Sequence, residues 1–268
     1  MKTKIFISAL FFLALSYSSF AQKANDYKWG LSIAINDAHS QVAFLGTAGL
    51  GLDAEGNVVL AGEKTNASFS LSVIPKYFIN EDWLIRFEYG ITQIDLKNFY
   101  TINSYTAPFP PTLYQINYDT VKQKINRYVA GVQFNFFKNK KIESYGGVNF
   151  PYIKYYQISR NSYSETRNAT TDTLTSKTIN FRNIPGGYAA GLGVFAGFNV
   201  YVFKYLSLGA EFSSAIMYYK VGGESIQISY FQAPPNAPLE TTTVIYNESY
   251  KGIRFTKILA SFNLTLWL

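Results

Sequence analysis

The sole histidine of the 268-residue chain is the first candidate for chemistry. His39 lies beside Asp37 and Ser40, and an imidazole with a hydroxyl and a carboxylate is the set of groups that acyl transfer uses. Adjacency in sequence is not the geometry of a catalytic triad, so we favour a solvated loop histidine. One histidine and no cysteine exclude a multi-histidine metal site and thiolate chemistry. We therefore expect no catalytic residue, no metal site and no cofactor.

Four charged residues form a second candidate site. Arg86 and Glu88 alternate with aliphatic and aromatic residues, and Arg127 and Glu211 occupy the same kind of position in two other segments. Successive side chains of a strand point to opposite faces. The four charges therefore belong to the face opposite the apolar one, and their chemistry depends on which strands bring them together.

The same two-residue alternation recurs along the chain and predicts eight strands, at residues 28–36, 68–77, 83–92, 127–136, 142–156, 188–203, 206–216 and 254–268. Short turns near 80–82, 138–141 and 203–205 alternate with polar segments near 37–66, 97–124, 157–187 and 221–252. An even number of strands with alternating short and long connections is typical of bacterial membrane barrels. The sequence thus predicts an all-β fold, an eight-stranded antiparallel transmembrane β-barrel with four long extracellular loops and three short periplasmic turns.

In such a barrel, Arg86 and Glu211 lie on the third and seventh strands, which face each other, so their side chains can meet across the lumen. An arginine that faces lipid at the midplane costs ~2–4 kcal/mol, which favours the lumen for these charges. An eight-stranded barrel has an interior just wide enough for side chains to fill. We interpret Arg86, Glu88, Arg127 and Glu211 as a lumen charge network that forms a structural plug. A gated ion path is the open alternative.

The N-terminal segment has the pattern of an export signal. Lys2 and Lys4 precede an apolar run from Ile5 to Leu15, and Ala21 ends a small-residue cleavage site. We expect residues 1–21 to be a cleaved signal peptide and residues 22–268 to be one outer-membrane β-barrel domain. The aromatic share of 18% favours a membrane–water interface, and the net charge of +7 is too diffuse to indicate nucleic-acid binding.

The last strand carries apolar residues at every second position, Phe262, Leu264, Leu266 and Leu268. With the export signal and the eight alternating strands, this end resembles the small outer-membrane β-barrel superfamily of Gram-negative bacteria, which includes OmpA-like, OmpX-like and PorT-like barrels. The resemblance implies an outer-membrane location and a C-terminal assembly signal, made of these four residues, for the barrel-assembly machinery. The chain departs from the family by ending in leucine where phenylalanine is commonest. We expect the last strand to pair with strand 28–36 and close the barrel.

A basic repeat marks the junctions between long loops and strands. Each long loop ends in a lysine that an aromatic residue follows four or five positions later, and arginines lie at the same level. The set is Lys64, Lys124, Lys177, Lys251, Arg182 and Arg254. In a barrel these residues would form a cationic ring at the outer rim, at the height of lipopolysaccharide phosphates, which lysine and arginine bind well. Ordinary snorkelling of basic residues explains the pattern equally well.

No catalytic motif accompanies the resemblance, so we expect a non-enzymatic integral outer-membrane β-barrel protein, a monomer, with a membrane-structural or surface-binding role. The tyrosine- and proline-rich segments 104–118 and 229–250 have the composition of binding surfaces. Expected partners are outer-membrane lipid or lipopolysaccharide, the barrel-assembly machinery and an unidentified surface ligand, but no nucleic acid. The alternatives are a lipid-modifying acyltransferase or deacylase that uses His39, similar to the outer-membrane lipid enzymes PagP and PagL, and a narrow gated pore.

Overall fold

The computed structural model describes residues 28–36, 70–104, 113–139, 141–233, 236–256 and 258–268. The fold in these residues is all-β, and they contain no helix that is long and apolar enough to cross a membrane. The expected signal peptide, the first long loop, His39 and Lys64 lie outside the described residues.

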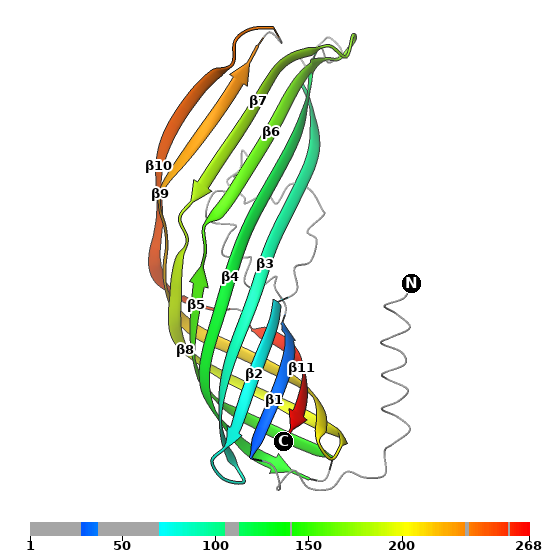
Figure 1. The fold of residues 1–268 in the computed structure, drawn as a ribbon, viewed down its shortest axis with the longest axis vertical. Coiled ribbons are helices and arrows are strands. Elements are labelled where there is room, and N and C mark those ends of the chain that lie inside the picture. Colours follow the sequence, from blue (N-terminus) through cyan, green and yellow to red (C-terminus); the bar gives the residue numbers. More distant parts are fainter. Residues whose placement is uncertain (1–27, 37–69, 105–112, 140, 234–235, 257) are drawn as a thin grey trace.

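Eight strands close into an antiparallel barrel (Figure 1). In spatial order they are β1 (Trp29–Asn36), β2 (Ser70–Phe78), β3 (Trp83–Ser104), β4 (Leu113–Lys138), β5 (Ile142–Tyr155), β8 (Gly187–Phe203), β9 (Leu206–Gln232) and β11 (Leu259–Trp267). The last strand, β11, pairs with β9 on one side and with β1 on the other, where Gly30 is opposite Trp267. This closure confirms the predicted pairing of the two ends and leaves the barrel without a free sheet edge.

The outer surface of the barrel carries a belt of exposed apolar side chains. They alternate with buried residues and include Leu31, Ile33, Val73, Ile85, Phe87, Val194, Leu208 and Phe262. Aromatic pairs border the belt below, where the ring centroids of Trp29 and Tyr77 are 4.7 Å apart. Above the belt, the aromatic border is a tyrosine row that consists of Tyr89, Tyr128, Tyr152 and Tyr188. An exposed apolar belt between two aromatic borders is the surface of a membrane-spanning barrel.

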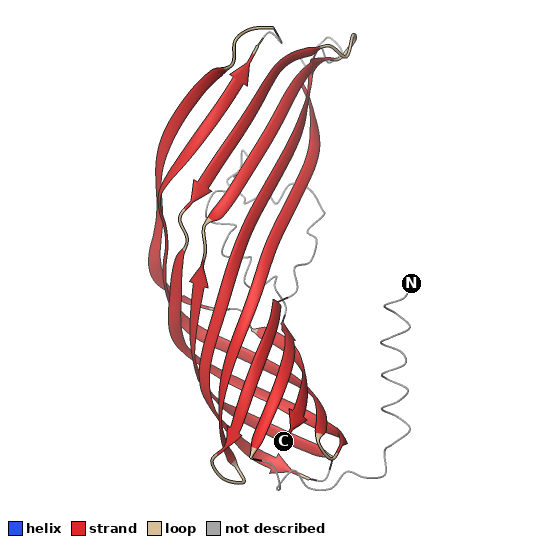
Figure 2. Cartoon of the chain, in the orientation of Figure 1, coloured by secondary structure: helices blue, strands red, loops and turns tan. Residues whose placement is uncertain are grey.

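Three further strands prolong one side of the barrel into an upper sheet, called the extension below (Figures 1 and 2). They are β6 (Ile158–Asn168), β7 (Leu174–Ile184) and β10 (Glu240–Phe255), and the extension has the strand order β3-β4-β6-β7-β9-β10. The three predicted polar loops at 97–124, 157–187 and 221–252 are therefore largely paired β-strands. Polar loops were predicted there because polar residues predominate in β6, β7 and β10, yet their backbones pair as regularly as those in the barrel.

The barrel and the extension meet at a seam where β5 breaks from β6, β7 from β8, and β10 from β11. Pro185 lies in one break and has no N–H to donate to a ladder. The next residue, Gly186, runs so close to β5 that a Cβ there would lie 2.0 Å from the Tyr155 carbonyl oxygen. Across the seam on β9, Gly222 has a φ of 83°, which disfavours residues with side chains. These breaks let the strands change direction without ending the sheet.

Candidate functional site

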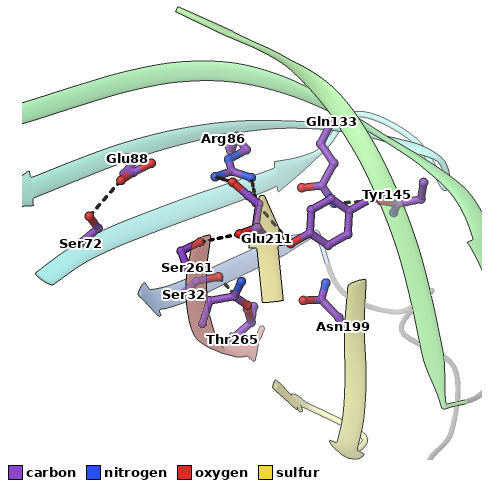
Figure 3. A network of polar contacts seen from close by, with 12 residues as sticks. Ser32, Ser72, Arg86, Glu88, Gln133, Tyr145, Asn199, Glu211, Ser261 and Thr265 are labelled. Carbon is purple, nitrogen blue, oxygen red and sulfur yellow. Dashed lines mark hydrogen bonds and ion pairs between the residues drawn. The ribbon is translucent and has the colours of Figure 1, made fainter. Parts of the chain in front are cut away.

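The centre of the lumen holds a buried ion pair between β3 and β9 (Figure 3). Arg86 donates two hydrogen bonds to the Glu211 carboxylate, at 2.5 Å from Nη1 and 2.9 Å from Nη2. The Tyr145 hydroxyl from β5 donates a third, at 3.2 Å, and the Arg86 guanidinium lies 4.4 Å from the centre of the Phe195 ring on β8. The predicted contact between Arg86 and Glu211 is present, and its two-bond geometry is the strongest that these groups form.

The other two predicted lumen residues form a second pair beside the first. Arg127 Nε lies 3.5 Å from Glu88 Oε1. The Ser72 hydroxyl donates to the same carboxylate at 2.9 Å (Figure 3). Arg127 is on β4, Glu88 on β3 and Ser72 on β2, so three neighbouring strands meet in this contact. All four predicted charges are buried and paired, in two separate pairs.

A third carboxylate, which sequence reasoning missed, lies lower in the lumen. Glu143 on β5 is fully buried and accepts hydrogen bonds from Asn135 at 2.6 Å, Asn199 at 3.0 Å and Tyr201 at 3.0 Å. The signal for it is weak, because two adjacent glycines at 146–147 and a proline at 151 blur the alternation of this segment.

The lumen also holds a third cation. Lys76 on β2 is 2% exposed, and its ammonium lies 5.5 Å from the centre of the Trp267 ring. In the sequence, Lys76 belongs to the same polar face as Ser70 and Ser72. A search of that face for every charged residue identifies it. Among the described residues, the buried charges are three cations and three carboxylates, which sum to zero. They are Lys76, Arg86, Arg127, Glu88, Glu143 and Glu211.

Apolar clusters lie below and above these charges. The lower apolar cluster consists of Phe78, Leu84, Tyr201 and Trp267. The upper apolar cluster consists of Ile94, Ile125, Ile153, Tyr155, Ile158, Ile184, Ala189, Met217, Tyr219 and Val221. On β3, Leu84 of the lower cluster precedes Arg86 and Glu88, and Ile94 of the upper cluster follows them. The lumen is thus layered, with the two arginine–carboxylate pairs between the clusters and Glu143 bonded to Tyr201 of the lower one.

The predicted basic rim is not one ring. Lys124 and Lys251 lie on the outer face near the seam, whereas Lys177 lies high on the extension, with its ammonium 5.1 Å from the centre of the Tyr163 ring. Arg182 and Arg254 lie on the inner face, because they are directly opposite Gln227 and Met217, which belong to the inner face of β9. The prediction placed the basic residues by their distance along the chain. It did not take into account that successive residues of a strand face opposite sides of the sheet. Lys64 is outside the described residues.

The residues of the expected assembly signal face outward. Phe262, Leu264, Leu266 and Leu268 are exposed, and they alternate with the buried residues Asn263, Thr265 and Trp267. The last of these anchors the strand from inside, because its indole N–H donates to the Ser207 hydroxyl at 3.1 Å. The terminal strand therefore contributes to the apolar belt on one face and to the lower apolar cluster on the other.

A polar cluster lies at the far end of the extension, where β6 and β7 meet in a turn. This tip cluster consists of Tyr114, Tyr163, Glu165, Arg167 and Asp172. The Tyr114 hydroxyl donates to the Asp172 carboxylate and the Tyr163 hydroxyl to that of Glu165. These hydrogen bonds hold the pKa of both carboxyls below its ordinary value, and Arg167, 2.9 Å from Glu165, acts in the same direction. Burial and the bond to Glu165 raise the pKa of Tyr163 to about 12.

An aromatic row crosses the outer face of the extension. The ring centroids of Phe99 and Tyr118 are 4.7 Å apart, and those of Tyr118 and Tyr163 are 5.9 Å apart. Phe99 and Tyr118 are 59% and 48% exposed, although they lie beyond the belt and past a polar stretch that includes Lys122. Exposed aromatic side chains in a contiguous row are typical of contact surfaces.

No family model matches the chain, and no curated relative matches it. The solved structures that are similar to it include Neisserial surface protein A and OprG. Neisserial surface protein A (NspA) is 12% identical over 90% of this chain and 96% of that chain, with a TM-score of 0.35. The outer membrane protein OprG from Pseudomonas aeruginosa is 10% identical over the same shares of the two chains, with a TM-score of 0.38. Similarities of this size carry no argument about ligand or role, so the functional argument depends on the residues themselves.

Proposed function

We propose that the chain is a non-enzymatic outer-membrane protein in which the barrel is a closed anchor and the extension is the surface-binding part. The observation that carries the proposal is the layered lumen. Its six buried charges sum to zero, both buried arginines are held by carboxylates, and large side chains of two mainly apolar clusters pack on either side of these pairs. A plug of this kind holds the barrel walls together and gives no path for transport.

The extension supports the binding half of the proposal. Its strands continue those of the barrel, so the sheet stands on a rigid base, and binding residues are often held in this way by a stable scaffold. The aromatic row supplies large side chains with few rotatable bonds, which lose little conformational freedom when a partner covers them. Lys177 beside Tyr163 adds a positive charge to the same surface.

A photo-cross-linking experiment on intact cells tests the proposal. The photoreactive residue p-benzoylphenylalanine replaces Phe99 or Tyr118 on the extension and, as the matched control, Phe150 on the belt, which is 58% exposed. We expect Phe150 to yield lipid adducts only, and the two extension positions to yield a discrete protein or glycan adduct. If all three positions give lipid alone, the role is membrane-structural and the binding half of the proposal is wrong.

A further inference from the structure

Four exposed lysines lie close together on the outer face, directly above the tyrosine row. Cross-strand pairs place three of them in one line, in which Lys154 is opposite Tyr188, Tyr188 opposite Lys220, and Lys220 opposite Lys251. The fourth, Lys124, joins through Tyr156, because the ammonium groups of Lys124 and Lys154 lie 5.4 Å and 5.2 Å from the centre of that ring. This lysine row spans five neighbouring strands, β4, β5, β8, β9 and β10.

The row contains an unfavourable pair. Lys220 and Lys251 are directly opposite each other, a position in which Cβ atoms lie roughly 4.5–5.5 Å apart and like charges destabilise a sheet. The ion pairs formed within the described part of the chain involve other residues, so no described carboxylate is in ion-pair contact with these two ammonium groups. A third positive charge, that of Lys154, lies two strands from Lys220 on the same line. Such a group is stable when an anion from outside the protein lies among the ammonium groups.

The position of the row identifies the anion. It follows the upper border of the apolar belt, where hydrocarbon ends and lipid headgroups begin. Lysine binds phosphate as a compact point charge with three donors. We propose that Lys154, Lys220 and Lys251 bind a phosphate of a lipid headgroup in the outer leaflet, and that Tyr188 packs against the same lipid from the middle of the line.

This site differs from a set of snorkelling lysines in one measurable way. Snorkelling residues act independently, so each lost lysine would weaken lipid binding by a similar amount wherever it lies around the rim. A shared phosphate couples Lys220 with Lys251, so losing either one removes most of the binding, and losing both adds little. The inference needs the barrel to span a membrane but does not depend on the surface-binding role.

The test uses the full chain in lipid nanodiscs that contain lipid A, with native mass spectrometry to count the lipids that stay bound. The variants are Lys220→Gln, Lys251→Gln and the double change. The matched control is Lys28→Gln with Lys141→Gln, which removes two exposed lysines at the opposite end of the barrel. We expect each single variant to lose about tenfold in lipid A retention, because a hydrogen bond to a charged group contributes about that factor. The double variant should lose little more, and the control should match the wild type.

Two further arms separate the sources of phosphate. Dephosphorylated lipid A should bind the wild type no better than it binds the double variant, and inorganic phosphate at millimolar concentration should not displace the intact lipid. The inference is overturned if the control loses as much as the double variant, if dephosphorylation has no effect, or if inorganic phosphate alone occupies the site. Heat-modifiability on a gel reports the barrel separately. An unfolded wild type would refute the membrane barrel itself, whereas a folded protein with unchanged binding refutes the lysine site alone.

Discussion

Strand β4 passes through two regions of the molecule whose surfaces differ while its backbone pairing does not. It pairs with β3 in one unbroken register from Trp83 opposite Phe134 in the barrel to Ser104 opposite Leu113 at the far end of the extension. In the barrel its outward residues are Tyr128, Ala130, Val132 and Phe134, and in the extension they are Tyr118, Thr120, Lys122 and Lys124. Strand pairing therefore sets the shape of the sheet, while the chemistry of the outer face sets which part of it contacts lipid.

The charges differ between the two regions as well. In the barrel, the side chains of Arg86 and Glu211 are 2% and 8% exposed, and their charges have no alternative partner in water. At the tip of the extension, those of Arg167 and Glu165 are 30% and 16% exposed, so water screens the pair. In the barrel, losing one partner of an ion pair leaves an uncompensated buried charge, whereas at the tip the remaining charge is exposed to water.

Removing the terminal strand should have the largest effect. A deletion of Phe262–Leu268 leaves the facing edges of β1 and β9 unpaired, and each unsatisfied backbone group in lipid costs several kcal/mol. We expect no folded barrel, measured as the loss of heat-modifiability on a gel. Deleting an equal length from the extension tip, residues 166–172, should leave heat-modifiability intact. A truncated protein that still shows the folded band would contradict the closure.

Breaking the central ion pair should have the next largest effect. Glu211→Ala leaves Arg86 buried without its partner and should lower the free energy of unfolding by about 3–5 kcal/mol, measured by urea unfolding in lipid vesicles. The double change Arg86→Met with Glu211→Leu should lose less than the single change, because no charge is then left unpaired. Glu165→Ala at the tip should lose far less than Glu211→Ala. Equal losses at the two sites would refute the contrast between the regions.

The eight strands and their faces are predictable from the sequence because lipid outside and a packed lumen inside force a clear alternation. The contact between Arg86 and Glu211 is predictable for the same reason, since strand number places them across the lumen. The strands of the extension are not, because both of their faces meet polar surroundings and polar residues predominate in β6, β7 and β10, where apolar residues are scattered. The prediction of a basic rim was wrong for Arg182 and Arg254. Their inward positions depend on the strand register across the seam, and loop length alone does not reveal that register.

The seam offers a way to disturb the extension alone. Gly222→Ala places a side chain at a φ of 83° and should cost about 1–2 kcal/mol locally. We expect faster amide hydrogen exchange in β9 and β10 above residue 222, with unchanged exchange in β1, β2 and β11. Gly146→Ala is the matched control, because the nearest atoms to its added Cβ are 3.5 Å away. If exchange rises equally in the barrel, the two regions do not open separately.

The smallest expected effect is a pH dependence at the tip. The pKa values of Glu165 and Asp172 are lowered in the folded state, so their stabilising contribution is present above the ordinary carboxyl pKa of about 4 and is lost as pH falls through the folded values. Amide protection of the β6–β7 turn should therefore fall in acid, after correction for intrinsic exchange rates. The double change Glu165→Gln with Asp172→Asn should remove this pH dependence. A wild-type turn with constant protection down to pH about 2 would contradict it.

The central claim is that the barrel is a sealed anchor and not a pore. Single-channel recording in planar bilayers tests it most directly, with the refolded protein inserted and its folded state checked by heat-modifiability. The layered lumen predicts no discrete conductance steps for the wild type, because the buried charges sum to zero, both arginines are held by carboxylates, and side chains fill the interior of an eight-stranded barrel. Steady conductance steps from the wild type, with an ion selectivity that changes on Glu211→Gln, would show that ions pass the charge network and would contradict the claim.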